Sequence, residues 1–347
     1  MAIFCKDKSR QMLHNIITLN LEVSDMLRLG AVTIDVSHPS GFAGKFLAME
    51  GGRAKYVAVF NDGFRSDEEV AEFAEQFDVK IYNDLDEMID NIDLGFVHSC
   101  NWDKHLDYVM HFVRKGKPVF VDKPIVGNLA DCEKILELSK SGAKILGTSA
   151  LRYAFEVVET REAMKKEGVN PILVSTSVGC DDFNYCIHGV EALAGIIDCS
   201  PVSCRYIGRS CVDKEGVESY MVKYENGASG IYNSFDKKFA LCSTTVLTDK
   251  APLGDYCFAI DNMKLYDAML PRIIDYMDGN EDALITVEQM VESIKVLLAG
   301  KASKLNGGKE ISLDDPILRE VSFDGYEFEA GYAANARAAR AAAKAAK

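Results

Sequence analysis

The sequence lacks any apolar run approaching the roughly 20 residues of a membrane-spanning helix. Its N-terminus also lacks the basic-then-apolar order of a secretory signal. Basic residues are in the minority, because 39 Lys and Arg stand against 53 Asp and Glu, which gives a formal net charge of -14. That charge repels the phosphates of nucleic acids. We therefore expect a cytoplasmic protein with neither a membrane nor a nucleic-acid partner.

Cysteine pairs at metal-binding spacing are also absent. None of the ten cysteines forms a C-x-x-C motif, and their neighbours are mostly apolar. This pattern is typical of small buried thiols in a reducing compartment rather than of disulfides or zinc ligands. No metal site is predicted.

The first half of the chain alternates short β-rich runs with amphipathic helical patterns. Continuous apolar strands between helices indicate a parallel sheet covered on both faces. The pattern predicts an α/β fold with an N-terminal Rossmann-type, doubly wound domain over residues 27–150. The strands are expected at 31–36, 55–60, 93–97, 118–121 and 143–147. Ser66 and Glu69 have capping-box spacing, which predicts a helix start.

The second half, residues 151–330, has a different rhythm. Alternating strands predict a C-terminal α+β domain with a largely antiparallel open sheet, and Asn226-Gly227 predicts a tight hairpin turn. A sheet with one uncovered face favours a homodimer or homotetramer. The strands are expected at 172–178, 217–224, 227–235 and 241–248, and the helices at 154–167, 189–198, 262–278 and 286–300.

Two terminal segments stand outside these domains. Residues 1–26 are either an extension or a mis-assigned start, since the segment from Met26 has the pattern of a natural beginning. Residues 331–347 form a low-complexity, helix-prone, basic tail without an apolar stripe. Neither segment is assigned a function.

Lys123 follows directly on the predicted strand 118–121, between Asp122 and Pro124. Ligands of doubly wound sheets collect at the carboxyl ends of the strands. The fixed φ of proline would hold this lysine at the crevice. The alternative is a solvated turn that carries a strand-terminal charge.

The segments "GKPVFVDKPI" and "AKILGTSALRYA" resemble the Gfo/Idh/MocA family of NAD(P)-dependent oxidoreductases. The E-K-P signature of that family corresponds to Asp122, Lys123 and Pro124 here. "NYCIHGVEAL" is similar to the D-x-G-x-H-x-x-D pattern of the family's second domain. The resemblance runs from about residue 27 to 315.

This resemblance implies hydride transfer between a nicotinamide cofactor, NAD or NADP, and a hydroxyl or keto carbon of a sugar, polyol or related carbohydrate. By resemblance, Lys123 donates a hydrogen bond to the reacting oxygen, and His188 is the general acid/base. Asn184 stands where the family usually has an aspartate that orients the histidine. Tyr185 could supply a phenol instead.

The first turn departs further from the Rossmann fingerprint. It reads "SHPSGFAG" in place of G-x-G-x-x-G, and only Gly41 and Gly44 remain. Either Ser37, His38 and Ser40 donate hydrogen bonds to a phosphate together with the helix N-terminus, or the phosphate site is weakened or lost.

The remaining cofactor contacts are also implied by the resemblance. Asn61 and Asp62 lie at the place of the residue that binds the adenosine ribose, which leaves NAD and NADP open. Arg152 matches an arginine near the nicotinamide, and its alternative role is a salt bridge that joins the domains. The other expected contacts are Ser99, Asn101, His105 and Asp122.

Two other functions are compatible with these residues. A glycosidase of the same fold would oxidise the sugar transiently with bound NAD and eliminate the aglycone. A non-catalytic binding or regulatory protein would account for Asn184 and the missing glycines.

Overall fold

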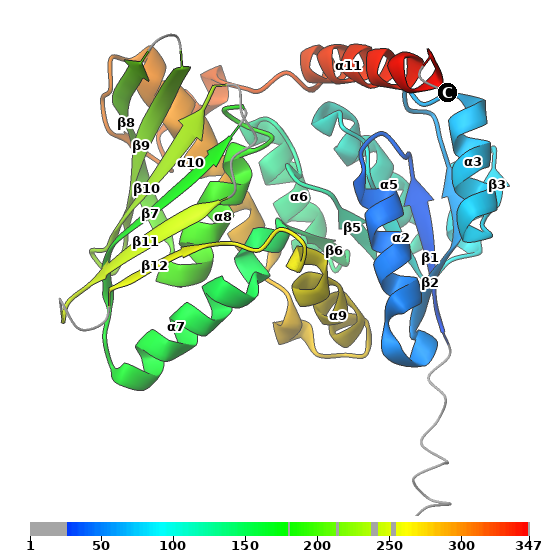
Figure 1. Ribbon diagram of the computed structural model, residues 1–347, viewed down its shortest axis with the longest axis horizontal. Coiled ribbons are helices and arrows are strands. Elements are labelled where there is room, and N and C mark those ends of the chain that lie inside the picture. Colours follow the sequence, from blue (N-terminus) through cyan, green and yellow to red (C-terminus); the bar gives the residue numbers. More distant parts are fainter. Residues whose placement is uncertain (1–25, 180, 213–214, 237–241, 251–254, 346–347) are drawn as a thin grey trace, which may run out of the picture.

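The computed structural model describes residues 26–179, 181–212, 215–236, 242–250 and 255–345. The predicted extension therefore lies outside the described residues, except for Met26. The first domain is a six-stranded parallel sheet with helices on both faces (Figure 1). Its elements are β1 (Leu27–Val32), α2 (His38–Ala48), β2 (Ala54–Phe60), α3 (Asp67–Phe77), β3 (Lys80–Tyr82), α4 (Leu85–Asp90), β4 (Leu94–Val97), α5 (His105–Lys115), β5 (Val119–Val121), α6 (Leu129–Lys140) and β6 (Ile145–Gly147).

The strand order β3-β2-β1-β4-β5-β6 confirms the predicted doubly wound sheet. The capping box of Ser66 and Glu69 forms as predicted at the start of α3. The predicted strand 31–36 was placed too late, because β1 ends at Val32 and Thr33 adopts a left-handed φ of 60°. The turn after β1 therefore begins four residues earlier than the sequence indicated.

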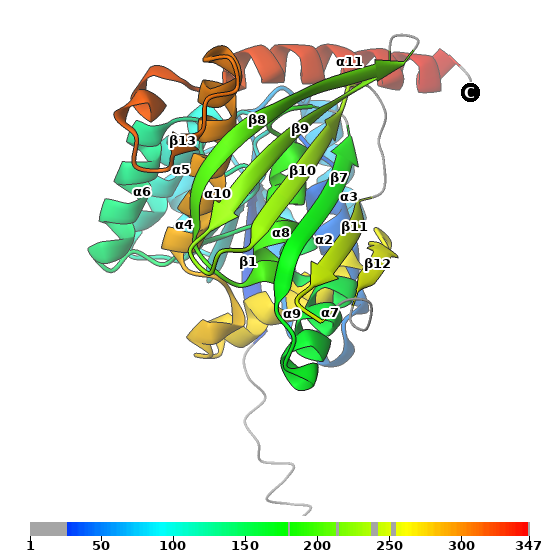
Figure 2. The same cartoon turned by 90° about the vertical axis from the view of Figure 1, so that its left-hand side faces the viewer.

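The second domain carries a seven-stranded mixed sheet in the order β12-β11-β7-β10-β9-β8-β13. Figure 2 shows this sheet face on, with α8 and α10 behind it. Its elements are α7 (Phe155–Glu167), β7 (Pro171–Gly179), α8 (Cys186–Ile197), β8 (Pro201–Val212), β9 (Glu215–Tyr224), β10 (Ser229–Phe235), β11 (Ser243–Thr248), β12 (Tyr256–Ala259), α9 (Leu265–Met277), α10 (Val287–Leu305) and β13 (Ile311–Ser312).

The sheet is largely antiparallel, as predicted, with one exception. The neighbouring strands β7 and β10 pair in parallel. The hairpin at Asn226 and Gly227 forms, with Gly227 at φ 85°. Strands β8, β12 and β13 of this sheet were missed. Many residues of β8 and β12 stay partly exposed and give a weak apolar signal, and β13 is only two residues long.

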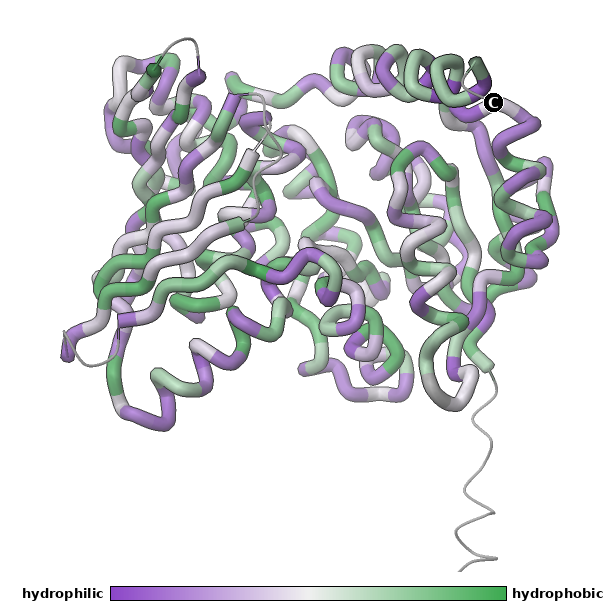
Figure 3. Tube along the Cα trace, in the orientation of Figure 1, coloured by the Kyte–Doolittle hydropathy of each residue, from purple (hydrophilic) through white to green (hydrophobic). Residues whose placement is uncertain are grey.

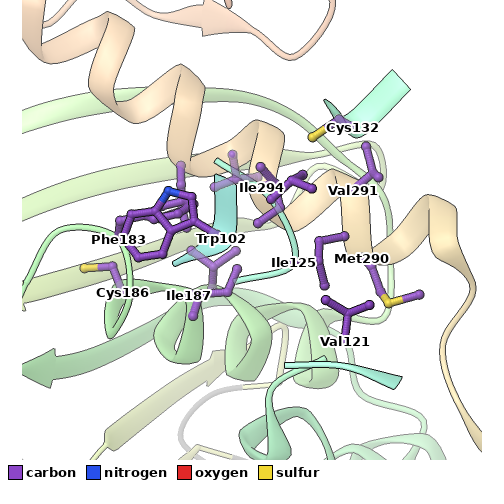
Figure 4. Close-up of a cluster of buried hydrophobic side chains, with 14 of the residues drawn as sticks. Trp102, Val121, Ile125, Cys132, Phe183, Cys186, Ile187, Met290, Val291 and Ile294 are labelled. Atoms are coloured by element: carbon purple, nitrogen blue, oxygen red, sulfur yellow. The ribbon is translucent and has the colours of Figure 1, made fainter. Parts of the chain in front are cut away.

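The two domains share hydrophobic cores. Figure 4 shows one contact, in which Val121 and Ile125 of the first domain face Met290 and Ile294 of α10. A second core joins the first sheet to α9, whose buried residues include Leu270. Burial on both sides of the boundary holds the domains in one arrangement.

The basic tail is part of a long helix, α11 (Gly325–Ala345), that crosses the top of the first domain (Figure 1). Hydrophilic and hydrophobic residues are interleaved along it (Figure 3). Arg340 pairs with Glu72 of α3 at 2.9 Å, and Lys344 pairs with Glu68 at 2.9 Å. The tail thus has a defined place on the first domain, which its composition did not indicate. None of the helices described here is long and apolar enough to cross a membrane.

Candidate active site

A cavity of about 220 Å³ lies where the two domains meet, beside the carboxyl end of β5. The first domain contributes the turn before α2 and the segment after β5, and the second domain contributes residues around α8 and α9. Both Lys123 and His188 line it, so the structure brings together the two residues expected to do the chemistry. The other lining residues are Ser37, His38, Phe42, Asp122, Thr148, Ala150, Leu151, Val178, Gly179, Tyr185, Cys242, Asn262, Leu265, Tyr266 and Met269.

Lys123 is tied to the second domain. Its Nζ donates to the backbone carbonyl oxygen of Asn184 at 2.9 Å and to Oδ1 of the same residue at 3.1 Å. Nζ also lies 5.1 Å from the centre of the Tyr185 ring, within the range of a cation–π contact. The amide of Asn184 therefore positions the lysine, whereas the family's aspartate was expected to orient His188.

His188 lies in the first turn of α8. Its Nδ1 and the Ser149 hydroxyl are 2.6 Å apart. Burial lowers the pKa of His188 well below its ordinary value, and the nearby positive charge of Lys123 lowers it further. At neutral pH this imidazole is therefore uncharged.

Asp122 joins two imidazoles at the floor of the cavity. Its Oδ2 lies 2.5 Å from Nδ1 of His38 and 3.1 Å from Nδ1 of His98. Burial alone would raise the pKa of Asp122, but the imidazole of His38 and then that of His98 outweigh burial and hold the pKa well below its ordinary value. The Tyr56 hydroxyl lies 2.9 Å from Nε2 of His98 and completes the chain of contacts.

Among the described residues, two groups have donor atoms close enough to share a metal ion. The first is His38, His98 and Asp122. Two ligands of a tetrahedral zinc ion stand about 3.3 Å apart, so the 2.5 Å between His38 and Asp122 indicates a direct hydrogen bond. The second group is Asp35, Cys100 and Glu329. Burial raises the pKa of the Cys100 thiol, so the thiol keeps its proton. A protonated thiol is a poor metal ligand, because metals bind the thiolate.

The crevice between the carboxyl ends of β1 and β4 is the switch point of the first sheet, where ligands of such sheets bind. Asp35 fills its floor and accepts hydrogen bonds from the backbone N–H groups of Phe64 and Cys100. Burial raises the pKa of Asp35 to about 6. From above, Glu329 of α11 accepts hydrogen bonds from Asn101 and Lys104, both at 2.9 Å.

Two expected cofactor residues have a different role in the structure. Gly41 was expected near a phosphate, but a Cβ at this position would lie 3.1 Å from the Tyr266 ring, so the glycine admits α9. Arg152 was expected near the nicotinamide, but it is buried and its Nε donates to Glu191 at 2.6 Å. This ion pair links the segment after β6 to α8 and lies outside the cavity lining.

The other residues expected to bind the cofactor lie around the crevice and form hydrogen bonds with other residues of the protein. Asn61 accepts from the backbone N–H of Ile34, and Asp62 accepts from the Tyr108 hydroxyl at 2.5 Å. The remaining three hold the loop after β4: Ser99 donates to Asp35, Asn101 binds Glu329, and the His105 ring contacts the carbonyl oxygens of Ser99 and Ile125.

Of the expected phosphate donors, Ser37 borders the cavity at the N-terminus of α2, whereas the His38 ring contacts Asp122 instead of facing outward. Tyr266 and Asn262 also line the cavity, but they were not predicted because no motif marks them. His98 and Ser149 were also missed, although His98 directly follows β4, Ser149 lies two residues after β6, and strand ends were the available signal.

Residues 40–149 match the Gfo/Idh/MocA model, described as "Oxidoreductase family, NAD-binding Rossmann fold". The match covers most of the first domain and agrees with the family that the sequence motifs resemble. The description of that family names an oxidoreductase class and an NAD-binding fold.

Among curated proteins, the chain is similar to an inositol 2-dehydrogenase from Paracoccus denitrificans (strain Pd 1222), with 26% identity over 91 residues. The alignment covers 26% of this chain and 27% of the relative, so it spans about a quarter of the relative's length.

Solved structures resemble the chain over most of its length. A myo-inositol dehydrogenase from Lactobacillus casei, in complex with NAD(H) and myo-inositol, has a TM-score of 0.67 at 16% identity and covers 85% of this chain and 99% of that one. A scyllo-inositol dehydrogenase from the same organism, with bound NAD(H) and scyllo-inositol, has a TM-score of 0.66 at 14% identity and covers 84% and 100%. At these identities the likeness shows the fold.

The residues present fit a nicotinamide cofactor at the cavity. Ser37 stands at the N-terminus of α2 and lines the cavity, where a helix N-terminus can bind a phosphate, and Lys123 lines the same cavity. At the crevice, two carboxylates, Asp35 and Glu329, occupy the space between the loops. The residues therefore fit the cofactor at the cavity, whereas at the crevice the fit depends on the position of α11.

Proposed function

We propose that the protein is an NAD(P)-dependent oxidoreductase that acts on a hydroxyl or keto carbon of a polyol, sugar or related carbohydrate. The observation that carries the proposal is the shared cavity of Lys123 and His188, which come from different domains. The inositol dehydrogenases that resemble the chain make a cyclic polyol the first substrate class to test.

In this proposal the chain's own residues bind the substrate oxygen and manage its proton. The ammonium of Lys123, held by Asn184, donates a hydrogen bond to the reacting oxygen and stabilises its developing negative charge. His188 and Tyr185 offer further hydrogen-bonding groups at the same cavity. The nicotinamide cofactor, when bound, supplies the site that accepts or donates the hydride.

The test combines cofactor titration with a substrate panel. NADH and NADPH fluorescence is titrated with the purified protein, and net reduction of NAD or NADP is followed with inositols, other polyols and sugars. Saturable binding with net reduction supports the proposal. Release of a chromogenic aglycone without net reduction would indicate the glycosidase instead. Absence of saturable binding would favour a non-catalytic protein.

The other expectations stay predictions. The expected cytoplasmic location stays a prediction. The expected homodimer or homotetramer is measured by light scattering of the purified protein, and the mass of a monomer at working concentration would contradict it.

A further inference from the structure

The cavity holds a second imidazole besides His188. The His38 ring lies beside those of Phe42 and Tyr266, whose centres are 5.6 and 5.9 Å away. Its Nδ1 is 2.5 Å from the Asp122 carboxylate. Nε2 is the nitrogen left for a ligand, and it makes no hydrogen bond to the part of the chain that the structure describes. A carboxylate behind an imidazole fixes its orientation and stabilises its protonated form.

Within the part of the chain that the structure describes, no carboxylate makes such a contact with His188. Its Nδ1 meets the neutral hydroxyl of Ser149, and Lys123 nearby disfavours a second positive charge. A general base has to carry the proton that it accepts. The surroundings of His188 oppose that state, whereas Nδ1 of His38 contacts the Asp122 carboxylate directly.

We propose that His38, supported by Asp122, is the general acid/base of the reaction, and that His188 is a positioning residue. This proposal rests on the proposed function. In the oxidation of an alcohol, the O–H bond breaks and its proton passes to Nε2 of His38, while the C–H bond breaks and its hydride passes to the nicotinamide cofactor. The substrate thereby loses two electrons and two protons in total, and a C=O bond forms. Lys123 binds the oxygen throughout.

The test is His38→Ala, measured with the best polyol found for the unmodified protein. We expect kcat to fall by about 100-fold or more, the scale of losing a general acid/base. NADH binding should change less than about threefold, and added imidazole should restore part of kcat. His111→Ala is the matched control, because that histidine lies on α5 and pairs with Asp86 at the surface.

A His38→Ala variant with kcat within about threefold of the unmodified protein would overturn the proposal. Rescue of His188→Ala by imidazole, without rescue of His38→Ala, would also overturn it. If the unmodified protein reduces neither cofactor with any substrate, the proposed function itself fails, and that outcome is visible before any variant is made.

The second inference concerns α11 and rests on different contacts. The first turns of this helix lie over the crevice at the switch point. Glu329 binds Asn101 and Lys104, and the Tyr332 ring lies 6.1 Å from that of Phe64. The carboxylate of Glu329 also faces that of Asp35. A dinucleotide that crosses this crevice would meet both a helix and two carboxylates.

The far half of α11 is weakly held. Its contacts with α3 are ion pairs of Arg340 and Lys344 at the surface, and solvated pairs of this kind contribute little to stability. A cavity of about 590 Å³ lies between the helix and α3, lined by Tyr332, Arg340 and their neighbours. Loose packing and solvated charges allow this half to detach at a small free-energy cost.

We infer that α11 is a cover over the cofactor crevice and that its docking competes with dinucleotide binding. The cofactor and the docked helix then exclude each other. Weakening the contacts of the helix increases the fraction of molecules in which the crevice is open, and the apparent affinity for the cofactor rises with that fraction. The inference also rests on the proposed cofactor, but its readout is binding and not turnover.

Three full-length variants test this cover. Glu329→Ala removes the contact at the crevice, and Arg340→Ala with Lys344→Ala frees the far half. Arg337→Ala is the matched control, because it removes one charge from an exposed position of the same helix. NADH and NADPH are titrated into each by fluorescence. We expect Glu329→Ala and the double variant to bind about 10-fold more tightly than the unmodified chain, with the control unchanged.

Unchanged affinity in Glu329→Ala and in the double variant would overturn the cover. Weaker binding would overturn it too, since it would make α11 part of the cofactor site. Absence of saturable binding in every form of the protein would remove the proposed cofactor together with the cover.

Discussion

Nζ of Lys123 donates to both oxygens of Asn184, the backbone carbonyl at 2.9 Å and Oδ1 at 3.1 Å. An amide thus holds the cation of one domain against the other domain. A carboxylate at this position would neutralise the ammonium more strongly. The amide of Asn184 carries no charge and does not itself neutralise the ammonium, whose positive charge can stabilise an oxygen that becomes negative during the reaction.

This relationship gives the first prediction. Lys123→Ala should lower kcat by about 100-fold or more, since it removes the donor to the reacting oxygen. Steady-state kinetics with the best polyol measures the effect, and Lys115→Ala, at the end of α5, is the control. Turnover near that of the unmodified chain would take Lys123 out of the mechanism.

Arg152 and Glu191 form a buried ion pair with an N–O distance of 2.6 Å. Arg152→Ala should lower the free energy of unfolding by about 3–5 kcal/mol, because it leaves the buried carboxylate without its partner. Urea denaturation measures the change. Replacing both residues with Met should restore most of the stability. A loss below about 1 kcal/mol in the single variant would show that the pair is unimportant.

Gly95 in β4 packs against an aromatic ring, and a Cβ there would lie 2.1 Å from Phe112. Gly95→Ala should destabilise the protein by about 1–3 kcal/mol through overpacking. Gly44→Ala in α2 is the matched control, since nothing lies within 4 Å of its added Cβ. That change should stabilise the helix by about 0.5–1 kcal/mol. Equal effects at both positions would contradict the packing argument.

The titration of Asp35 should make the free energy of unfolding depend on pH. Burial raises its pKa from 3.8 to about 6, so between these values the folded state keeps a proton that the unfolded state has lost. Its contribution to stability is therefore greatest below about pH 4 and falls as the pH rises through 6, by about 3 kcal/mol in total.

About 1 kcal/mol of that loss falls between pH 5 and pH 8. The measurement is the difference in the free energy of unfolding between the unmodified chain and Asp35→Asn at the two pH values. This difference cancels the titration of the other carboxylates. A difference that is constant with pH, or one that moves in the opposite direction, would show that the carboxyl titrates normally.

Local and motif-based features could be predicted from the sequence. The capping box of Ser66 and Glu69 depends on residues three positions apart, and it forms as expected. The alternation of strands and helices gave the parallel sheet, since each element buries its own apolar face. The resemblance placed Lys123 and His188 in one cavity, although 65 positions separate them.

Features that depend on distant partners could not be predicted. Arg152 was ambiguous because Glu191, its partner, is identifiable only once α8 is packed. Tyr266 reaches the cavity because α9 packs on α2, a contact that no periodicity encodes. The docking of α11 was missed for a similar reason: its helix lacks an apolar stripe and is held by ion pairs such as that of Arg340 with Glu72, 268 positions away.

The packing of α9 has one more consequence. This helix comes late in the chain, yet Leu270 and Ile273 are fully buried in the core of the first sheet, and Lys45 of α2 pairs with Asp267. A fragment that stopped at residue 150 would expose to solvent the apolar residues of the first domain that α9 covers. The two domains are therefore joined on this side by the apolar contacts of α9 and by its ion pair with α2.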